Sequence, residues 1–245
     1  MTDQLPSLNV STSDYVTSLA KGAFGAIPFA GPIAAEIIGH IIPNQRADRI
    51  VRFVELLEER VKHLEQESFR ERCLQPDSVD LVEDALFQAA RAKSQDRLEH
   101  LANLVANGLA GDDPKQAEAS KMLWLLERLN DVEVILLRAR LVQTNEDVQR
   151  DAEFREKHAT VIAPRGAHLG SSWDEIEDEA IHNSYKQHLV ELGLLRPNFK
   201  RPRKNELPEF DPKTGMMKSS GHEVTLLGRM FLRYLNLIPE WAERK

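Results

Sequence analysis

Apolar residues recur at spacings of three and four along most of the chain, with charged residues between them, and this pattern predicts a mainly α-helical protein. The spacing predicts helices over about 44–64, 75–89, 94–110 and 114–129. Asn44 and Ser94 are expected to cap two of these helices, and Gly111 is expected to end the third. We therefore predict a helical bundle over residues 45–130.

The pattern changes after this bundle. Asp131 is expected to cap a short helix, and a strongly charged segment follows it over residues 145–159. A helix of about twenty residues is then expected to start at Ser172 and to end at Gly193. We expect these helices to form the first part of a separate C-terminal domain.

Two short strands are predicted next, at residues 194–195 and 222–224, with a long Pro- and Lys-rich loop between them. Thr225 is expected to cap a last helix after the second strand. This order of helices and strands is that of a winged helix-turn-helix. The fold prediction is therefore mainly α: an N-terminal helical bundle with an apolar hairpin, followed by a winged-helix-like domain with a small β-hairpin over residues 131–245.

The apolar hairpin is expected within residues 1–44, where the segment 22–43 is rich in glycine, alanine and isoleucine. Pro28 and Pro32 are expected to break it, which leaves an uninterrupted helix from about Pro32 to Ile42, near eleven residues, against roughly 20 for a membrane span. Its length fits a hairpin buried in the bundle, which we favour, and also a segment that the protein releases into a membrane on a trigger. The side chains that would enter the membrane are Ile27, Phe29, Ile33, Ile37, Ile38, Ile41 and Ile42.

Composition limits the partners and the compartment. The net charge of −7 and the pI near 5.7 do not suggest a general nucleic-acid coat, for which a basic surface is expected. Cys73 has no second cysteine with which to form a disulfide, and the acidic N-terminus lacks the basic region of a secretory signal. We expect a cytoplasmic protein, with peripheral contact to the inner membrane as the open alternative.

The chain carries only weak motifs for nucleotide binding, hydrolysis or metal binding. The glycines of the apolar segment are not followed by the Lys-Ser or Lys-Thr of a phosphate loop, and no G-x-S-x-G is found. Glu175, Glu179 and His182 share a helix face with the offset of half a di-iron site, but a second half is missing, so a solvated acidic face is favoured. We predict no catalytic residue, no cofactor and no metal ion, and therefore not an enzyme.

Charge also bears on the winged-helix-like domain. The helix that would enter the DNA groove carries an acidic face, and repulsion from phosphates disfavours nucleic acid as a partner. The acidic face is Asp174, Glu175, Glu177, Asp178 and Glu179. The loop after it forms a basic wing suited to a phosphate backbone, an acidic protein or anionic lipid, unless it is simply a solvated loop. The basic wing is Arg196, Lys200, Arg201, Arg203 and Lys204.

Several segments carry a family resemblance. They are AFGAIPFAGPIAAEIIGHIIP, ALFQAARAKSQDRLEHLANLVANGLAG, LLERLNDVEVILL, HLVELGLLRP and EVTLLGRMFLRYL. Together they resemble uncharacterised bacterial proteins related to the abortive-infection alpha (Abi-alpha) group. The resemblance implies a role in bacterial defence against phage, and because its motifs are packing motifs it transfers no catalytic residue.

Three functions remain, in this order. The first is a non-enzymatic anti-phage effector that acts on the inner membrane through the apolar hairpin. The second is an interaction module in which the acidic face and the basic wing are complementary surfaces for assembly as a homo-oligomer, or with another protein of a defence system. The apolar helix face from Ile50 to Leu64 is the alternative seam, which we favour as the main one. The third is a winged-helix DNA-binding regulator.

Overall fold

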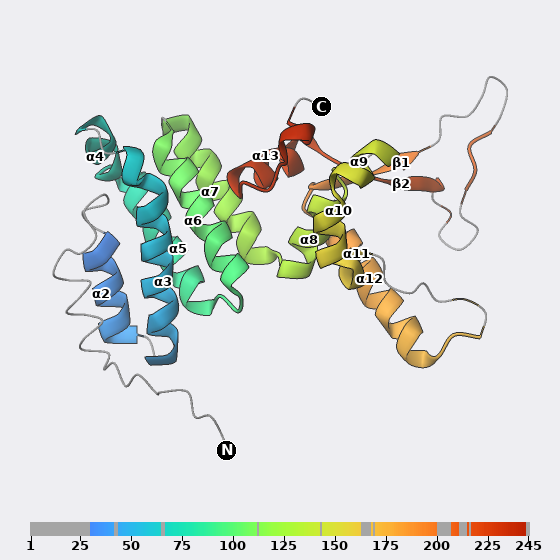
Figure 1. Ribbon diagram of the computed structural model, residues 1–245, viewed down its shortest axis with the longest axis horizontal. Helices are drawn as coiled ribbons and strands as arrows, with labels where there is room; N and C mark the ends of the chain where they lie inside the picture. Colours follow the sequence, from blue (N-terminus) through green and yellow to red (C-terminus); the bar gives the residue numbers. More distant parts are fainter. Residues whose placement is uncertain are drawn as a thin grey trace, which may run out of the picture. The chain divides into compact units, whose positions relative to one another are not determined.

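The protein is mainly helical, with one two-stranded antiparallel sheet near the C-terminal end of the chain (Figure 1). The computed structural model describes residues 30–41, 44–64, 67–111, 113–142, 144–162, 168, 170–199, 207–210, 215 and 217–243. These residues divide into two compact units. The first contains the residues up to Glu127 and the short segment Tyr234–Asn236, and the second contains the remainder.

The first unit is built of helices. They are α2 (Ala30–Ile41), α3 (Asn44–Val61), the 3-10 turn η1 (Lys62–Leu64), α4 (Glu67–Cys73), α5 (Pro76–Arg91), α6 (Gln95–Ala110) and α7 (Asp113–Arg128). The long helices predicted from the periodicity are confirmed, whereas α4 was not predicted. The hydroxyl of Ser94 accepts a hydrogen bond from the backbone N–H of Arg97 at 3.1 Å, which confirms Ser94 as the N-cap of α6.

The core of this unit lies between α3, α5 and α6, which pack side by side (Figure 1). Ile50, Val54, Leu57 and Val61 of α3 are fully buried in it. The expected use of this face as the seam between subunits is therefore wrong, because its side chains already pack inside the subunit. Helix α2 packs on α3 and α5.

The uninterrupted helix expected from about Pro32 to Ile42 is present as α2, which begins two residues earlier. Helix α2 begins at Ala30, so Pro32 lies in its first turn, where a backbone N–H has no intrahelical partner to lose. The other half of the expected apolar hairpin, residues 22–29, lies outside the described residues.

The second unit combines short helices with the sheet. Its elements are α8 (Asp131–Ala139), α9 (Asn145–Arg150), α10 (Ala152–Lys157), α11 (Ala159–Ile162), α12 (Trp173–Glu191), β1 (Leu195–Phe199), β2 (Ser219–Val224), α13 (Leu226–Tyr234) and η2 (Glu240–Ala242). The strands pair with Leu195 opposite Val224 and Pro197 opposite His222, and the register shifts between Asn198 and Phe199. Helix α12 packs on both α8 and β1.

Capping side chains set the starts of α8 and α12. The expected cap of α8, Asp131, is wrong: Asn130 caps it, accepting from the Glu133 N–H at 2.9 Å while the Glu133 carboxylate accepts from the Asn130 N–H at 2.8 Å. Ser172 caps α12 as expected and forms the same reciprocal pair with Glu175.

The charged segment 145–159 folds into short helices because two of its carboxylates are buried and bonded. Asp151 accepts two hydrogen bonds from the guanidinium of Arg138, at 2.6 and 3.1 Å. Asp147 closes a capping box with Thr144 at the start of α9. The segment is therefore part of the folded unit.

Thr225 joins the sheet to α13. Its hydroxyl donates to the carbonyl of Gly193 at 2.6 Å and accepts from the N–H of Gly228 at 3.0 Å, which confirms it as the cap. Gly228 sits against the backbone here, since a Cβ at this position would lie 2.4 Å from the carbonyl oxygen of Leu194. Glycine at this site allows the helix to pack against the turn that ends α12.

Candidate functional site

The apolar face of α2 is turned into the first unit. Ala34, Ile37 and Ile38 are at most 4% exposed, and Ala30 and Ala35 are also buried. Ile33 is half-buried, while Glu36 is exposed on the opposite side. The small alanines allow α2 to approach α3 and α5 closely.

The side chains of the other residues expected to enter the membrane are not described. Ile27, Phe29 and Ile42 lie outside the described residues, and of Ile41 only the backbone in α2 is described. Within the described part of the chain, the helices fall short of the length and apolar character that crossing a bilayer requires.

The residues of the predicted acidic face lie on more than one side of α12. Asp174, Glu177 and Asp178 are exposed, whereas Glu175 and Glu179 are half-buried on the side that also carries His182. The exposed side includes apolar residues, among them Trp173 at 78%, Ile181 at 50% and Ile176 at 42% exposure. This outer surface of α12 therefore mixes acidic and large apolar side chains.

Glu175, Glu179 and His182 do not form the metal half-site that their spacing suggested. Glu175 is engaged at the helix start, where its carboxylate accepts a hydrogen bond from the Ser172 N–H. No cluster of three or more His, Cys, Asp and Glu side chains suited to a metal ion is found in the described ranges.

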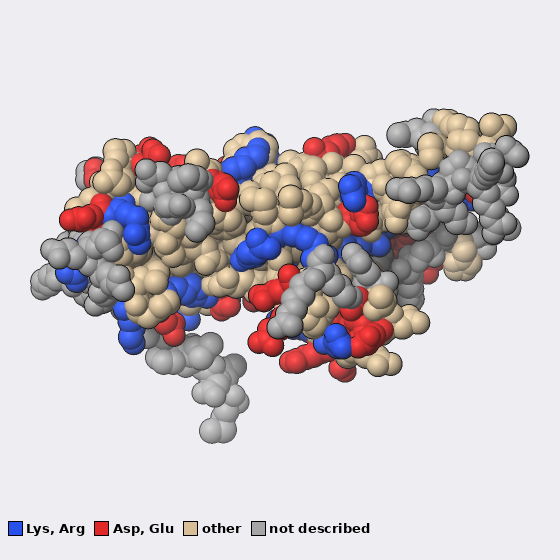
Figure 2. Space-filling model, turned by 90° about the horizontal axis from the view of Figure 1, so that it is seen from above, with Lys and Arg blue, Asp and Glu red and all other residues tan. Residues whose placement is uncertain are grey.

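Arg196 is the one residue of the basic wing that lies among the described residues. Arg196 lies on β1 and donates from Nε to a carboxylate oxygen of Glu223 on β2 at 2.5 Å, and Glu223 is its direct cross-strand neighbour. Lys200, Arg201, Arg203 and Lys204 lie outside the described residues. Over the face in Figure 2, acidic and basic side chains are interspersed among other residues.

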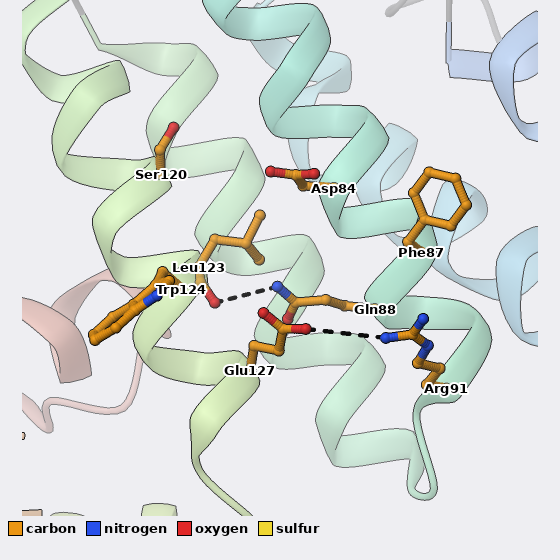
Figure 3. Close-up of a pocket in the computed structure, with 8 residues that line it drawn as sticks. All are labelled: Asp84, Phe87, Gln88, Arg91, Ser120, Leu123, Trp124 and Glu127. Carbon is orange, nitrogen blue, oxygen red and sulfur yellow. Dashed lines mark hydrogen bonds and ion pairs between the residues drawn. The ribbon is translucent and has the colours of Figure 1, made fainter.

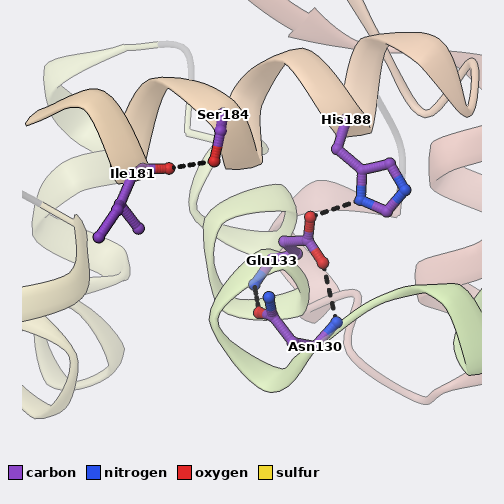
Figure 4. Close-up of polar contacts among 5 residues, drawn as sticks. All are labelled: Asn130, Glu133, Ile181, Ser184 and His188. Atoms are coloured by element: carbon purple, nitrogen blue, oxygen red, sulfur yellow. Dashed lines mark hydrogen bonds and ion pairs between the residues drawn. The ribbon is translucent and has the colours of Figure 1, made fainter.

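A buried carboxylate holds a histidine in the second unit (Figure 4). Glu133 is 3% exposed, and its Oε1 lies 2.6 Å from Nδ1 of His188 near the end of α12. Its other oxygen caps α8. The nearby Ser184 hydroxyl donates to the carbonyl of Ile181 at 2.7 Å, so it is engaged within its own helix. The pair clamps α12 to the start of α8, and sequence reasoning missed it because the two residues are far apart in the chain.

A shallow groove of about 150 Å³ lies between α5 and α7 in the first unit (Figure 3). Gln88 donates to the carbonyl of Leu123 at 3.3 Å, and Arg91 lies 4.0 Å from Glu127 across the groove. Burial raises the pKa of the Asp84 carboxyl, and the charges of Asp80 and Glu127 raise it further. The Gln88 hydrogen bond and the ion pair of Arg91 with Glu127 link α5 to α7 across the groove.

The comparisons with known proteins add no assignment. No family model, no curated protein and no solved structure matches this chain. Functional inference therefore rests on the described side chains and on the sequence motifs.

Proposed function

We propose that this protein is a non-enzymatic effector of bacterial defence against phage that acts on the inner membrane through α2. The observation that carries the proposal is how α2 is held: much of its buried face is alanine, with Ala30, Ala34 and Ala35 beside Ile37 and Ile38. Short side chains make few contacts each. Detaching α2 therefore sacrifices less packing than detaching a helix that buries leucine and phenylalanine.

A membrane offers α2 an environment equivalent to the one it leaves. Its apolar face is removed from water in either place, so exchanging bundle for lipid changes the hydrophobic free energy of α2 itself little. At 1.5 Å per residue its 12 residues extend about 18 Å, less than the roughly 30 Å of a bilayer core. The released helix would lie in the lipid interface, with the exposed Glu36 toward water.

Two variants of α2 separate membrane action from simple misfolding. Ala34→Leu overpacks a fully buried position and loosens α2 while keeping it apolar. Ile37→Glu with Ile38→Glu also loosens it, but charges its lipid-binding face. We expect expression of the Ala34→Leu protein to depolarise the inner membrane more than the unmutated chain does, and the double variant to depolarise it less.

The readouts are a membrane-potential dye, plaque counts on cells that carry each variant, and circular dichroism of the purified proteins. Equal depolarisation by the two loosened variants would show that unfolding causes the effect. A folded double variant that still depolarises cells and protects them from phage would exclude the membrane role.

A protein-interaction module is the second candidate, and the outer surface of α12 favours it. Trp173, Ile176 and Ile181 are exposed there beside the carboxylates of Asp174 and Glu177. Exposed large apolar side chains next to charge are typical of a docking surface. The partner would be a second copy of the chain or another protein of the defence system.

Sedimentation velocity across a concentration and salt series tests self-assembly. If the α12 surface pairs two copies, Trp173→Ser with Ile176→Ser should give a monomer, and the α6 surface variant Glu99→Ser should not. A monomer at every concentration in the unmutated protein would rule out the homo-oligomer.

The second unit also supports a winged-helix arrangement, since α8, α12, the β1–β2 hairpin and α13 follow one another in that order. A DNA-binding regulator is the third candidate on this ground. The exposed carboxylates of Asp174, Glu177 and Asp178 on α12 oppose it, because they would face the phosphate backbone. We expect any DNA binding to be weak, strongly dependent on salt and without sequence preference, as a footprinting titration would report.

A further inference from the structure

A cluster of basic side chains lies where three elements of the second unit meet. Arg140 directly follows α8, His182 and Lys186 lie one turn apart on α12, and His222 lies in β2 opposite Pro197. Helix α12 packs on α8 and on β1, the partner strand of β2. The fold therefore brings together basic groups that are far apart in the chain.

Each of these groups is at least partly removed from water. His182 is only 9% exposed, and Arg140, Lys186 and His222 are half-buried. The His182 ring forms no hydrogen bond with any described residue. Lys186 donates to the side-chain oxygen of Asn183 at 3.3 Å, a contact with a neutral amide.

The charges of Arg140 and Lys186 act on both histidines, and that of Arg140 also acts on Lys186. Burial lowers the pKa of His182 and of His222, and the charges of Lys186 and Arg140 lower both further. Burial also lowers the pKa of Lys186, with Arg140 adding to the effect and the carboxylate of Glu179 opposing it. The pKa of Arg140 is lowered by burial and then by the nearby Arg155 of α10.

Three other arginines of this unit each form an ion pair with a carboxylate. Arg138 pairs with Asp151, Arg150 with Glu146 and Arg196 with Glu223. Within the described residues, by contrast, Arg140, Lys186, His182 and His222 form no ion pair. The nearby carboxylate of Glu179 offsets part of this positive charge, and a bound anion would offset the remainder.

We propose that Arg140, His182, Lys186 and His222 form a binding site for a phosphate group carried by a small ligand. Arg140 supplies a planar set of donors that fits phosphate oxygens, and Lys186 supplies a compact charge. The two imidazoles add N–H donors and take up protons as the anion binds. The half-buried setting suits a free or terminal phosphate and excludes the continuous backbone of a duplex. This site is independent of the membrane role proposed for α2.

Calorimetric titration of the full chain with inorganic phosphate tests the site, with chloride at matched ionic strength as the reference. We expect saturable binding at about pH 8 that tightens as the pH falls towards 6, because binding is coupled to proton uptake by His182 and His222, which burial and the neighbouring charges keep mostly neutral in the free protein. Lys186→Gln and Arg140→Gln should each weaken binding about tenfold or more. The matched variant Arg196→Gln, at a neutralised surface arginine, should bind as the unmutated protein does.

Thermal unfolding without phosphate supplies the control for folding. Lys186→Gln removes a repelling charge, so this variant should be at least as stable as the unmutated chain while it loses the phosphate-dependent rise in melting temperature. Vesicles with phosphomonoester headgroups form a second arm, and binding to them that the same variants abolish identifies a lipid as the source of the phosphate. Absence of binding in both arms, or binding that Lys186→Gln and Arg140→Gln leave unchanged, would overturn the proposal.

Discussion

Cys73 ends α4 with its side chain fully buried. Burial raises the pKa of its thiol from 9.0 to about 11; the Glu58 carboxylate adds to the effect, and the Arg72 charge partly opposes it. Thiolate is the reactive form, so a two-unit rise in pKa lowers reactivity about 100-fold near pH 8 before any loss of access. We expect a coloured disulfide reagent to modify the native protein at least that much more slowly than the same chain in urea. Equal rates would contradict the buried position of Cys73.

Arg138 and Asp151 form the buried ion pair of the second unit, with side chains 9% and 2% exposed. Arg138 also lies 4.4 Å from the Phe154 ring centre. Removing one partner leaves the other charge buried alone, so we expect Asp151→Ala to lower the free energy of unfolding by about 3 kcal/mol or more. Replacing both partners together, by Arg138→Met with Asp151→Leu, should recover most of this loss.

Urea unfolding measures these changes, and the exposed pair Arg150 and Glu146 on α9 is the matched control. Glu146→Ala should change stability by less than about 1 kcal/mol, because water screens that pair. A similar effect of Asp151→Ala and Glu146→Ala would mean that Asp151 is not buried against Arg138.

Gly108 lets α6 lie close to its neighbours in the first unit. A Cβ at this position would lie 2.6 Å from the Cβ of Ala119 on α7 and 2.9 Å from a methyl of Leu81 on α5. Gly108→Ala should therefore lower stability by about 1 to 3 kcal/mol, although alanine favours helix over glycine by about 1 kcal/mol. Adding Ala119→Gly removes the nearer contact, so urea unfolding of the double variant should show a smaller loss than the two single losses together.

Element boundaries could be predicted where one residue decides them locally. Ser94, Ser172 and Thr225 cap helices as the sequence indicates, and Gly193 ends α12 in a left-handed conformation at a φ of 73°. Pro32 marks the start of α2 to within two residues, because proline is tolerated in the first turn of a helix. These signals act over a few residues, which is why the mainly helical fold followed from them.

The candidate sites depend on contacts between distant residues, and single-sequence patterns do not reveal these. The charged segment 145–159 gives no hydrophobic period, yet Asp151 is buried because Arg138 lies opposite it. On α12 the half-buried side carries Glu175, Glu179 and His182 while Trp173 is exposed, which reverses the usual amphipathic order. Charge alone could not show which of these residues face inward.

At the scale of the whole molecule, the histidines make the stability of the second unit depend on pH. The pKa values of His182 and His222 lie below the ordinary 6.5 in the folded protein. Above pH 6.5 both rings are neutral whether the chain is folded or not, so they leave stability unchanged. As the pH falls below 6.5 towards the folded pKa values, these histidines bind more protons in the unfolded chain than in the folded unit. The free energy of unfolding therefore falls.

The first unit should respond in the opposite direction at lower pH. The raised pKa of Asp84 means that its folded form takes up a proton before the unfolded chain does, so acidification above the ordinary 3.8 adds stability there. We expect urea unfolding between about pH 8 and pH 5 to separate into two transitions as the pH falls, because the second unit weakens first. His182→Gln with His222→Gln should abolish the shift of that transition, whereas His63→Gln, at an exposed position in the first unit, should preserve it. If the transition moves equally in both variants, these two histidines do not govern the acid sensitivity of the second unit.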